Sequence, residues 1–157
     1  MITIRQATLL DLLNFAPLGL RYSEEAGKHN NFPFDLDRTL HCAGQTIVSD
    51  EGCFLLAYDE GKPVGFLWGG CRSLPWSKAK LAVDTILYVV PESRSTSVGY
   101  RLMKEWEEWA INQGAVEVQI SIASGIHEEK SIAFFNKLGY SHTGTQYRKE
   151  IKHGIKP

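Results

Sequence analysis

The sequence predicts one α/β (α+β) domain, residues 1–157, whose elements follow the order β-α-α-β-β-β-α-β-α-β. A chain of 157 residues is long enough for one sizeable core and too short for two. Short apolar runs typical of strands alternate with segments whose apolar residues repeat at helical spacing. Because strands outnumber helices and neighbouring strands are often hairpins, we expect a mixed sheet.

The first elements are a strand and a helix. Residues 2–6, "ITIRQ", alternate apolar and polar side chains, which predicts a short strand. Thr8 and Asp11 have the spacing of a capping box, so a helix should begin there. Pro17 is a point at which this helix could kink or split. The side chains expected to face inward are Leu12, Leu13, Ala16 and Leu20.

A loop, a helix and a hairpin follow. Residues 27–34 have loop composition, and the next apolar residues lie on one helical face: Leu36, Leu40, Ala43 and Ile47. The apolar runs 53–58, "CFLLAY", and 63–70, "PVGFLWGG", are separated by Asp-Glu-Gly-Lys, which predicts two strands joined by a tight turn.

Proline and glycine mark the ends of several of the remaining elements. The run 81–90, "LAVDTILYVV", predicts a strand that stops at Pro91. The next helix ends near Gly114, and its inward side chains should be Val98, Leu102, Met103, Trp106, Trp109 and Ala110. Residues 116–122 predict a strand, and a short helix carrying Ile132, Phe135 and Leu138 ends at Gly139. Residues 140–151 have the pattern of a last strand.

Composition narrows the classes of function. Seventeen basic and eighteen acidic residues give a net charge of −1 without a basic block, so no nucleic-acid partner is expected. No run of about 18 apolar residues suggests a membrane span, and the N-terminus lacks the pattern of a secretion signal. Three widely spaced cysteines fit neither a disulfide framework nor a metal site, which favours the cytoplasm.

The loop between the strand 81–90 and the following helix suggests an anion site. Residues 94–99, "RSTSVG", combine a cation, three small hydroxyl residues and a glycine directly before a helix. Helix N-termini carry unsatisfied N–H groups and a partial positive charge, and small residues allow an anion to approach them. The sequence has neither GxxxxGK[ST] nor GxGxxG, so the common nucleotide loops are excluded. From the loop alone, helix capping by Ser95, Thr96 and Ser97 is the favoured explanation of these residues.

Two segments resemble the GNAT superfamily of N-acetyltransferases. "VVPESRSTSVGYRLM", residues 89–103, resembles its acyl-CoA motif, in which Arg or Gln is followed by xxGxG or xxGxA. "SIAFFNKLGY", residues 131–140, resembles its "AxxxYxKxGF" segment. The predicted order of elements is also similar to the family's over nearly the whole chain. The resemblance implies a mostly antiparallel sheet with helices on both faces, and transfer of an acetyl group from acetyl-CoA to an amine.

The resemblance also implies a cofactor site. Amides of the loop and the first helical turn would hold the pyrophosphate of coenzyme A, and backbone groups of the preceding strand would hold the pantetheine arm. The implied residues are Leu87, Tyr88, Val89, Arg94, Ser95, Thr96, Ser97, Val98, Gly99 and Tyr100. The strand 81–90 would then have to separate from the strand 116–122. Ser97 replaces the motif's first glycine, which is tolerable where the backbone is not left-handed.

Asp84 is the candidate general base. An alkyl amine of pKa near 10.4 is protonated at pH 7, so its transfer chemistry needs a base or a water chain. Asp84 is a lone carboxylate within an apolar strand, where desolvation would raise its pKa. The alternative is an ion pair of Asp84 with Arg72, Lys78 or Lys80 at the open end of the strand. No metal-ligand cluster is expected.

Departures from the family's pattern leave a second hypothesis open. Phe135 stands where relatives often carry a tyrosine that protonates the leaving thiolate, and Glu128 stands where many carry an asparagine. The leading prediction is a direct-transfer N-acetyltransferase acting on a small-molecule or peptide amine. The alternative is a catalytically degenerate module that binds acyl-CoA as a sensor or interaction partner. A homodimer is compatible with either hypothesis.

Overall fold

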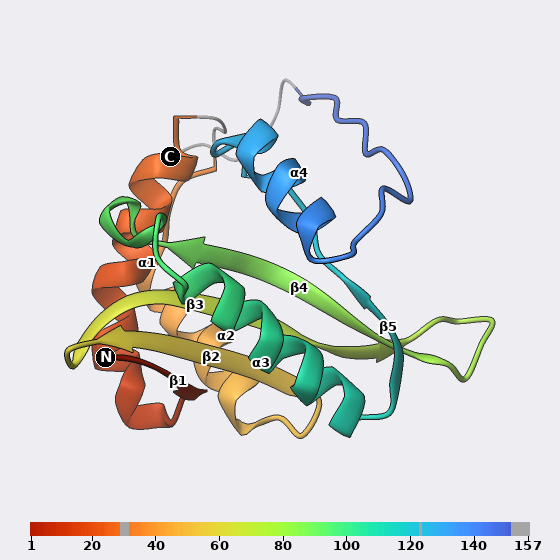
Figure 1. Cartoon of the computed structure of the whole chain (residues 1–157), viewed down its shortest axis with the longest axis horizontal. Helices are drawn as coiled ribbons and strands as arrows, with labels where there is room; N and C mark the ends of the chain where they lie inside the picture. The colour runs from red at the N-terminus through yellow and green to blue at the C-terminus, as the bar shows by residue number, and fades with distance from the viewer. Residues whose placement is uncertain (29–31, 123, 152–157) are drawn as a thin grey trace. The chain divides into compact units, whose positions relative to one another are not determined.

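The computed structural model describes residues 1–28, 32–122 and 124–151 (Figure 1). The chain forms two compact units by its contacts. The first comprises Met1–Tyr22 and Asp35–Ser121, and the second comprises Ser23–Phe34 and the chain from Ile122 onward. Part of the loop expected at 27–34, residues 29–31, lies outside the described residues. The single domain expected over residues 1–157 stays a prediction.

The first unit is built on one five-stranded sheet. Its strands lie in the order β1 (Ile2–Gln6), β2 (Gly52–Asp59), β3 (Lys62–Ser73), β4 (Lys80–Val89) and β5 (Ala115–Gln119). The first three pairings are antiparallel, whereas β4 and β5 are parallel. Short connections join β2 to β3 and β3 to β4, but two helices lie between β1 and β2 in the chain. A parallel neighbour needs a crossover, and the helix between β4 and β5 supplies it. The predicted mixed, mostly antiparallel sheet is therefore confirmed.

Helices cover both faces of this sheet. The longer helices are α1 (Leu12–Ala26), α2 (Leu36–Val48), α3 (Val98–Asn112) and, in the second unit, α4 (Glu128–Lys137); short 3₁₀ turns η1 (Leu9–Asp11) and η2 (Pro91–Ser93) precede α1 and α3. Figure 1 shows α3 in front of the sheet and α2 behind it. Among the described residues, no helix combines the length and apolar character needed to cross a bilayer.

Aromatic side chains form the core between the sheet and α1 with α2. The Phe15 ring meets the Phe54 and Phe66 rings edge-on at centroid distances of 4.8 and 5.0 Å. Edge-to-face contacts of this kind add stability beyond the buried area. Ala43 of α2 is fully buried in the same cluster, and Leu40 and Ile47 pack against it. The inward face predicted for residues 36–47 is therefore confirmed.

On the opposite face, α3 packs closely because β3 has a glycine beneath it. Val98, Leu102, Met103, Trp106 and Ala110 are all fully buried, as the helical spacing predicts. Trp109, also expected inward, is only partly buried and stacks on Trp106 at a centroid distance of 5.3 Å. A Cβ at Gly69 would lie 2.6 Å from the Trp106 ring, closer than real Cβ atoms come to their neighbours. Gly69 therefore allows the indole to lie directly on the sheet. Gly114 follows the end of α3 with a φ of 79°, a left-handed conformation suited to glycine.

The inward face of α1 differs from the predicted one. Leu13 and Leu20 are 82% and 41% exposed, and Phe15 and Leu18 are buried in their place. The segment "LLDLLNFAPLGL" is apolar on almost every side, so its spacing does not distinguish one face from another. The tertiary contacts decide instead. Pro17 lies inside a continuous helix, so the possible split does not occur.

Of the two strands predicted in the C-terminal part, one is absent and the other is shorter than expected. The described residues 140–151 contain no strand, and all of those from 141 onward are exposed. An alternating pattern becomes a strand only where a neighbouring strand pairs with it, and this segment has none in the structure. The strand expected at 116–122 begins one residue earlier and ends at Gln119.

In α4, Phe135 is buried and packs on Phe134 and Tyr140, with ring centroids 5.4 and 6.1 Å apart.

Candidate active site

β4 and β5 pair over only part of their length. The pairing runs from Lys80 opposite Ala115 to Val83 opposite Gln119, after which β5 ends and β4 continues for six more residues. In Figure 1, the arrow of β5 is shorter than that of β4, which continues past it. Among the described residues no strand pairs with the second half of β4 on the β5 side, so this half has a free edge there. The separation of β4 from β5, which the resemblance to the acyl-CoA motif implies, is therefore present.

The backbone direction of β4 decides which groups lie at that free edge. The Val90 N–H donates to the Val64 carbonyl of the β3 segment at 2.9 Å. Peptide groups alternate in direction along a strand, so those of Leu87 and Val89 face away from β3. The backbone of Tyr88 faces β3 by the same alternation, and its side chain is buried in the core. Of the three expected pantetheine contacts, Leu87 and Val89 have their backbone groups at the free edge.

A β-bulge places Asp84 at the point where β5 stops pairing. Gly69 lies opposite Asp84 and Trp68 lies opposite Ile86, so Thr85 is the extra residue in β4. Bulges bend a strand and redirect its side chains, and they are common next to active sites. Asp84 directly follows Val83, the last β4 residue paired with β5.

The Asp84 carboxylate is held by Ser121, just beyond β5. The Ser121 N–H donates to Oδ1 at 2.9 Å, and its hydroxyl lies 3.2 Å from Oδ1 and 3.4 Å from Oδ2. Burial raises the pKa of Asp84 to about 6, against the opposing effect of the Ser121 hydrogen bonds. In the described part of the chain Asp84 has no ion pair, so the alternative pairing with Arg72, Lys78 or Lys80 is wrong.

Tyr22 of α1 is a site residue that the sequence analysis missed. Its ring contacts the Tyr88 and Phe66 rings at centroid distances of 5.7 and 6.4 Å. Burial, and then the negative charge of Asp84, raises the pKa of the Tyr22 hydroxyl. The hydroxyl therefore stays protonated near Asp84 and can donate a hydrogen bond. Tyr22 lies four residues after Leu18 and seven after Phe15, so a correct assignment of the inward face of α1 would have found it.

The hydroxyl of Thr96 forms hydrogen bonds within the loop before α3. The Thr96 Oγ1–H donates to the Ser93 carbonyl at 2.6 Å, and the same oxygen accepts from the Val98 N–H at 3.3 Å. The Thr96 N–H also donates to Ser93, at 3.2 Å. Thr96 and Val98 therefore use their polar groups within the loop and keep its shape. Ser97 at the N-cap has a φ of −78°, so serine replaces the motif's glycine without backbone strain.

Four amides of this segment remain available. Within the described residues, no protein acceptor is found for the N–H groups of Ser95, Ser97, Gly99 and Tyr100. The side chains of Ser95 and Ser97 are exposed, as is that of Tyr100. The four amides lie at the positive end of a 15-residue helix. Their number and place fit a pyrophosphate, and the free edge of β4 fits an extended arm that hydrogen-bonds along a strand.

The charged side chains around the loop are organised by two contacts. The Arg94 Nε–H donates to the Val89 carbonyl at 2.9 Å, and its guanidinium lies 5.6 Å from the Tyr88 ring centroid. Arg94 thus ties the loop to the end of β4 and places a positive charge beside the free edge. Arg21 of α1 forms a two-fold ion pair with Glu92 at 2.8 and 2.7 Å, which lowers the pKa of Glu92 to about 2.

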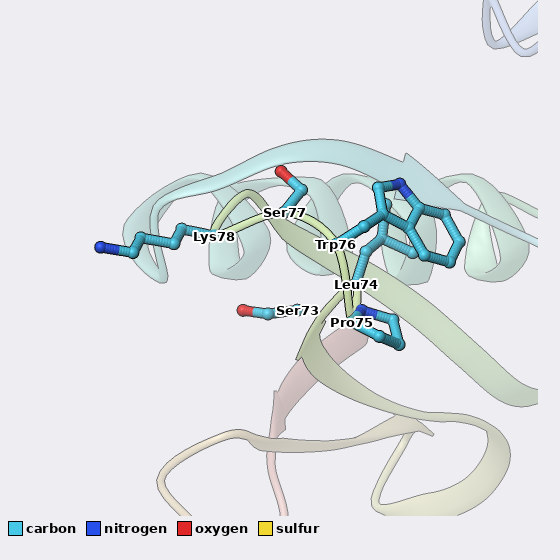
Figure 2. Close-up of a pocket in the computed structure, with 6 residues that line it drawn as sticks. All are labelled: Ser73, Leu74, Pro75, Trp76, Ser77 and Lys78. Carbon is cyan, nitrogen blue, oxygen red and sulfur yellow. The ribbon is translucent and has the colours of Figure 1, made fainter.

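A surface hollow elsewhere on the first unit contains none of these residues. It is formed by consecutive residues Ser73–Lys78 of the connection between β3 and β4, as Figure 2 shows, and it measures about 410 Å³. Trp76, 80% exposed, forms one side. This connection precedes β4, whereas the loop 94–100 follows it, and neither Asp84 nor any residue of that loop lines the hollow. The hollow is therefore not the candidate active site.

Comparisons with known proteins bear on this arrangement. The model of the acetyltransferase (GNAT) family matches residues 18–140. An aminoglycoside acetyltransferase from an uncultured soil metagenomic sample is 16% identical, with a TM-score of 0.76 and coverage of 97% of this chain and 99% of that chain. Aminoglycoside N-acetyltransferase AAC(6′)-Iy in complex with CoA is 18% identical, with a TM-score of 0.77 and coverage of 97% and 95%.

A third similar structure comes from Brucella melitensis biovar Abortus 2308. This ribosomal-protein-alanine N-acetyltransferase is 16% identical, with a TM-score of 0.73 and coverage of 96% of this chain and 99% of that chain. At these identities the likeness concerns the fold. No curated protein matches the chain in sequence.

Proposed function

The chain belongs to the acetyltransferase (GNAT) family, and on that basis we propose that it is an acetyl-CoA-dependent N-acetyltransferase. It moves an acetyl group to a primary amine by direct transfer in a ternary complex. The observation that carries the proposal is the position of Asp84. A carboxylate of raised pKa lies where β5 leaves β4, between a free strand edge and helix α1.

The cofactor fits the open hydrogen-bond donors of the site. The amides of Ser95, Ser97, Gly99 and Tyr100 would hold the pyrophosphate, with the dipole of α3 adding to the attraction. Each hydrogen bond would contribute roughly 0.5–1.5 kcal/mol to binding. The backbone groups of Leu87 and the N–H of Val89 would hold the pantetheine arm as an added strand. When bound, acetyl-CoA supplies the acetyl group and a thiol leaving group.

Asp84 receives the proton of the incoming amine. With a pKa of about 6, its carboxyl is mostly ionised at pH 7, yet it is more basic than an ordinary aspartate. A primary ammonium of pKa near 10.4 costs on the order of 4.6 kcal/mol to deprotonate at pH 7 without help. A nearby carboxylate reduces this cost by accepting the proton as the amine nitrogen begins to attack. The Tyr22 hydroxyl can help to orient the amine by donating a hydrogen bond to a polar group beside the amine.

The chain's backbone and thiols support direct transfer. The Val89 N–H at the free edge of β4 is placed to stabilise negative charge on a carbonyl oxygen. A covalent acyl-enzyme would need a nucleophile, and burial raises the pKa of the Cys53 thiol to about 12. Burial also raises the pKa of Cys71. Thiols kept protonated inside the sheet are poor nucleophiles.

The acceptor class follows from the base and from the similar structures. Deprotonation by Asp84 calls for an amine that is an ammonium ion in solution. The similar proteins include acetyltransferases named for aminoglycosides and one named for a ribosomal-protein alanine. Small polyamines, aminoglycosides and peptides with a free amino group are therefore the panel to screen.

The first experiment measures thermal unfolding with and without saturating acetyl-CoA. A ligand present at 100 times its dissociation constant adds about 2.7 kcal/mol of stability, a rise in Tm of several degrees for a chain of this size. Ser97→Glu should abolish the rise by placing a carboxylate against the pyrophosphate, whereas Ser97→Ala should retain it because the amides remain. A rise that survives Ser97→Glu would remove this loop from the site.

The second arm of the experiment follows thiol release with the panel of amines. Turnover on any amine, reduced about 10²–10⁴-fold by Asp84→Asn with acetyl-CoA binding retained, supports the enzyme. Binding of acetyl-CoA without turnover on any amine would instead favour an acyl-CoA-binding module. No rise in Tm with either acetyl-CoA or CoA, in a folded sample, would overturn the cofactor assignment.

A further inference from the structure

Ser121 connects the two strands at the place where they separate. It lies two residues beyond the end of β5, and strand pairing has already stopped at Gln119. The Ser121 N–H and hydroxyl nevertheless reach across to Asp84 of β4. The backbone donor is fixed by the path of the chain, and the hydroxyl adds a second donor from the same residue. The Asp84 carboxylate therefore has a defined orientation at the start of the free edge.

The contacts differ between the two carboxylate oxygens. Oδ1 accepts from the Ser121 N–H at 2.9 Å and lies 3.2 Å from its hydroxyl, whereas Oδ2 has a longer contact of 3.4 Å to the same hydroxyl. The Asp84 N–H also donates to its own carboxylate. A carboxylate oxygen has two acceptor sites, so Oδ1 serves both Ser121 donors, whereas Oδ2 shares only the hydroxyl. A base that must accept a proton from a substrate needs such an open oxygen.

We propose that Ser121 is a positioning residue for the reaction: its two donors fix Oδ1 of Asp84 and leave Oδ2 for the acceptor amine. This inference rests on the proposed function, in which Asp84 is the base. Ser121 itself exchanges no proton with the substrate. Its hydroxyl orients the carboxylate and, by donating to the ionised form, sets the pH at which Asp84 becomes a base.

Few other groups face Asp84. On the α1 side the titratable neighbour is Tyr22, whose hydroxyl remains protonated near the carboxylate. On β3 the residue opposite is Gly69, which has no side chain. Among the described residues no lysine or arginine contributes to the pKa of Asp84. A change in the titration of Asp84 on altering Ser121 can therefore be assigned to the Ser121 contact.

The experiment compares wild type, Ser121→Ala and Ser121→Thr. The pH dependence of kcat/KM is measured with an amine that turns over, and the Asp84 carboxyl carbon is titrated by ¹³C NMR in the full chain. Ser121→Ala removes one donor to the carboxylate, so both titrations should move to higher pH by roughly half a unit to one unit. The rate on the high-pH plateau should fall about three- to ten-fold. Ser121→Thr, which keeps the hydroxyl, should restore both values.

The two measurements separate the possible failures. If wild type acetylates amines and Ser121→Ala changes neither titration, the positioning role is wrong even if the variant is less stable. If Ser121→Thr titrates like Ser121→Ala, the hydroxyl is not the cause and the inference is also wrong. If no amine is acetylated but the NMR titration shifts as expected, the contact is confirmed and the proposed function fails separately.

Discussion

Two carboxylates of the first unit show how surroundings determine the role of one residue type. Asp11 accepts both Nη groups of Arg5 at 2.7 Å, as well as the Thr8 N–H and the Tyr58 hydroxyl. These donors hold the pKa of Asp11 well below its usual range. Asp84 has no cationic partner in the described parts of the chain, and burial raises its pKa to about 6. Asp11 stabilises the fold in its charged form, whereas Asp84 is kept in a form that can take up a proton.

The buried charge of Asp84 should reduce the free energy of unfolding at neutral pH. Its pKa is about 6 in the folded chain, against 3.8 for an unperturbed aspartate, so the folded state binds more protons between these values. Stability should therefore fall as pH rises from about 4 to about 6. We expect Asp84→Asn to raise stability at pH 7.5 by on the order of 1 kcal/mol, a figure reduced for partial exposure. At pH 4 the gain should disappear.

The check is the Tm of wild type and Asp84→Asn at both pH values. Asp50→Asn, at an exposed turn residue, is the matched control for loss of one negative charge. A gain of a few degrees at pH 7.5 that disappears at pH 4, together with lost turnover, would show a residue retained for function at a cost in stability. A lower Tm for Asp84→Asn at both pH values would show that its hydrogen bonds to Ser121 outweigh the burial of its charge.

At the scale of elements, the loop at residues 94–100 depends on α1 as well as on β4 and α3. Arg94 ties the loop to the end of β4, and Arg21 ties the turn η2 to α1 through Glu92. Glu92 lies two residues before Arg94, so its charge would oppose an anion bound at the loop. The paired guanidinium of Arg21 offsets that charge. Helix α1 therefore contributes to the electrostatics of a loop some 70 residues away in sequence.

Two variants distinguish two possible roles of the Arg21–Glu92 ion pair: to neutralise the charge of Glu92 and to tether the turn η2 to α1. Arg21→Met and Glu92→Gln both remove the ion pair, but only Arg21→Met leaves an uncompensated carboxylate near the loop. We expect Arg21→Met to weaken CoA binding about two- to five-fold at low salt, and Glu92→Gln to retain or strengthen it. Isothermal titration calorimetry at two salt concentrations measures both. Equal weakening by the two variants would mean that the pair acts only as a tether.

At the scale of the whole molecule, the main feature is a strand edge inside a sheet. Free edges invite pairing with another strand and are usually covered. Here β4 has its edge open beyond Val83, close to the amides before α3. The arrangement suits a ligand that has an extended, hydrogen-bonding arm and a doubly charged anionic group. The core on both faces of the sheet keeps β4 in place while its edge remains open.

Hydrogen exchange tests this arrangement over the whole chain. Acetyl-CoA should slow exchange of the amides of Leu87 and Val89 and of the open amides at 95, 97, 99 and 100, because each gains an acceptor. The hairpin of β1 and β2 should show no change and serves as the internal control. Protection confined to the hollow at Ser73–Lys78 would place the ligand elsewhere and contradict the proposed site.

The sequence by itself determined the sheet class and the helices α2, α3 and α4, and it predicts the anion loop and the role of Asp84. These features depend on local spacing, on helix-end residues and on a lone charge in an apolar strand. The tertiary structure alone decided the inward face of α1, because that segment is apolar on all sides. It decided the absence of a strand at 140–151, because a strand needs a partner. It also identified Tyr22 and Ser121, since both act on Asp84 across distances in sequence that no local pattern records.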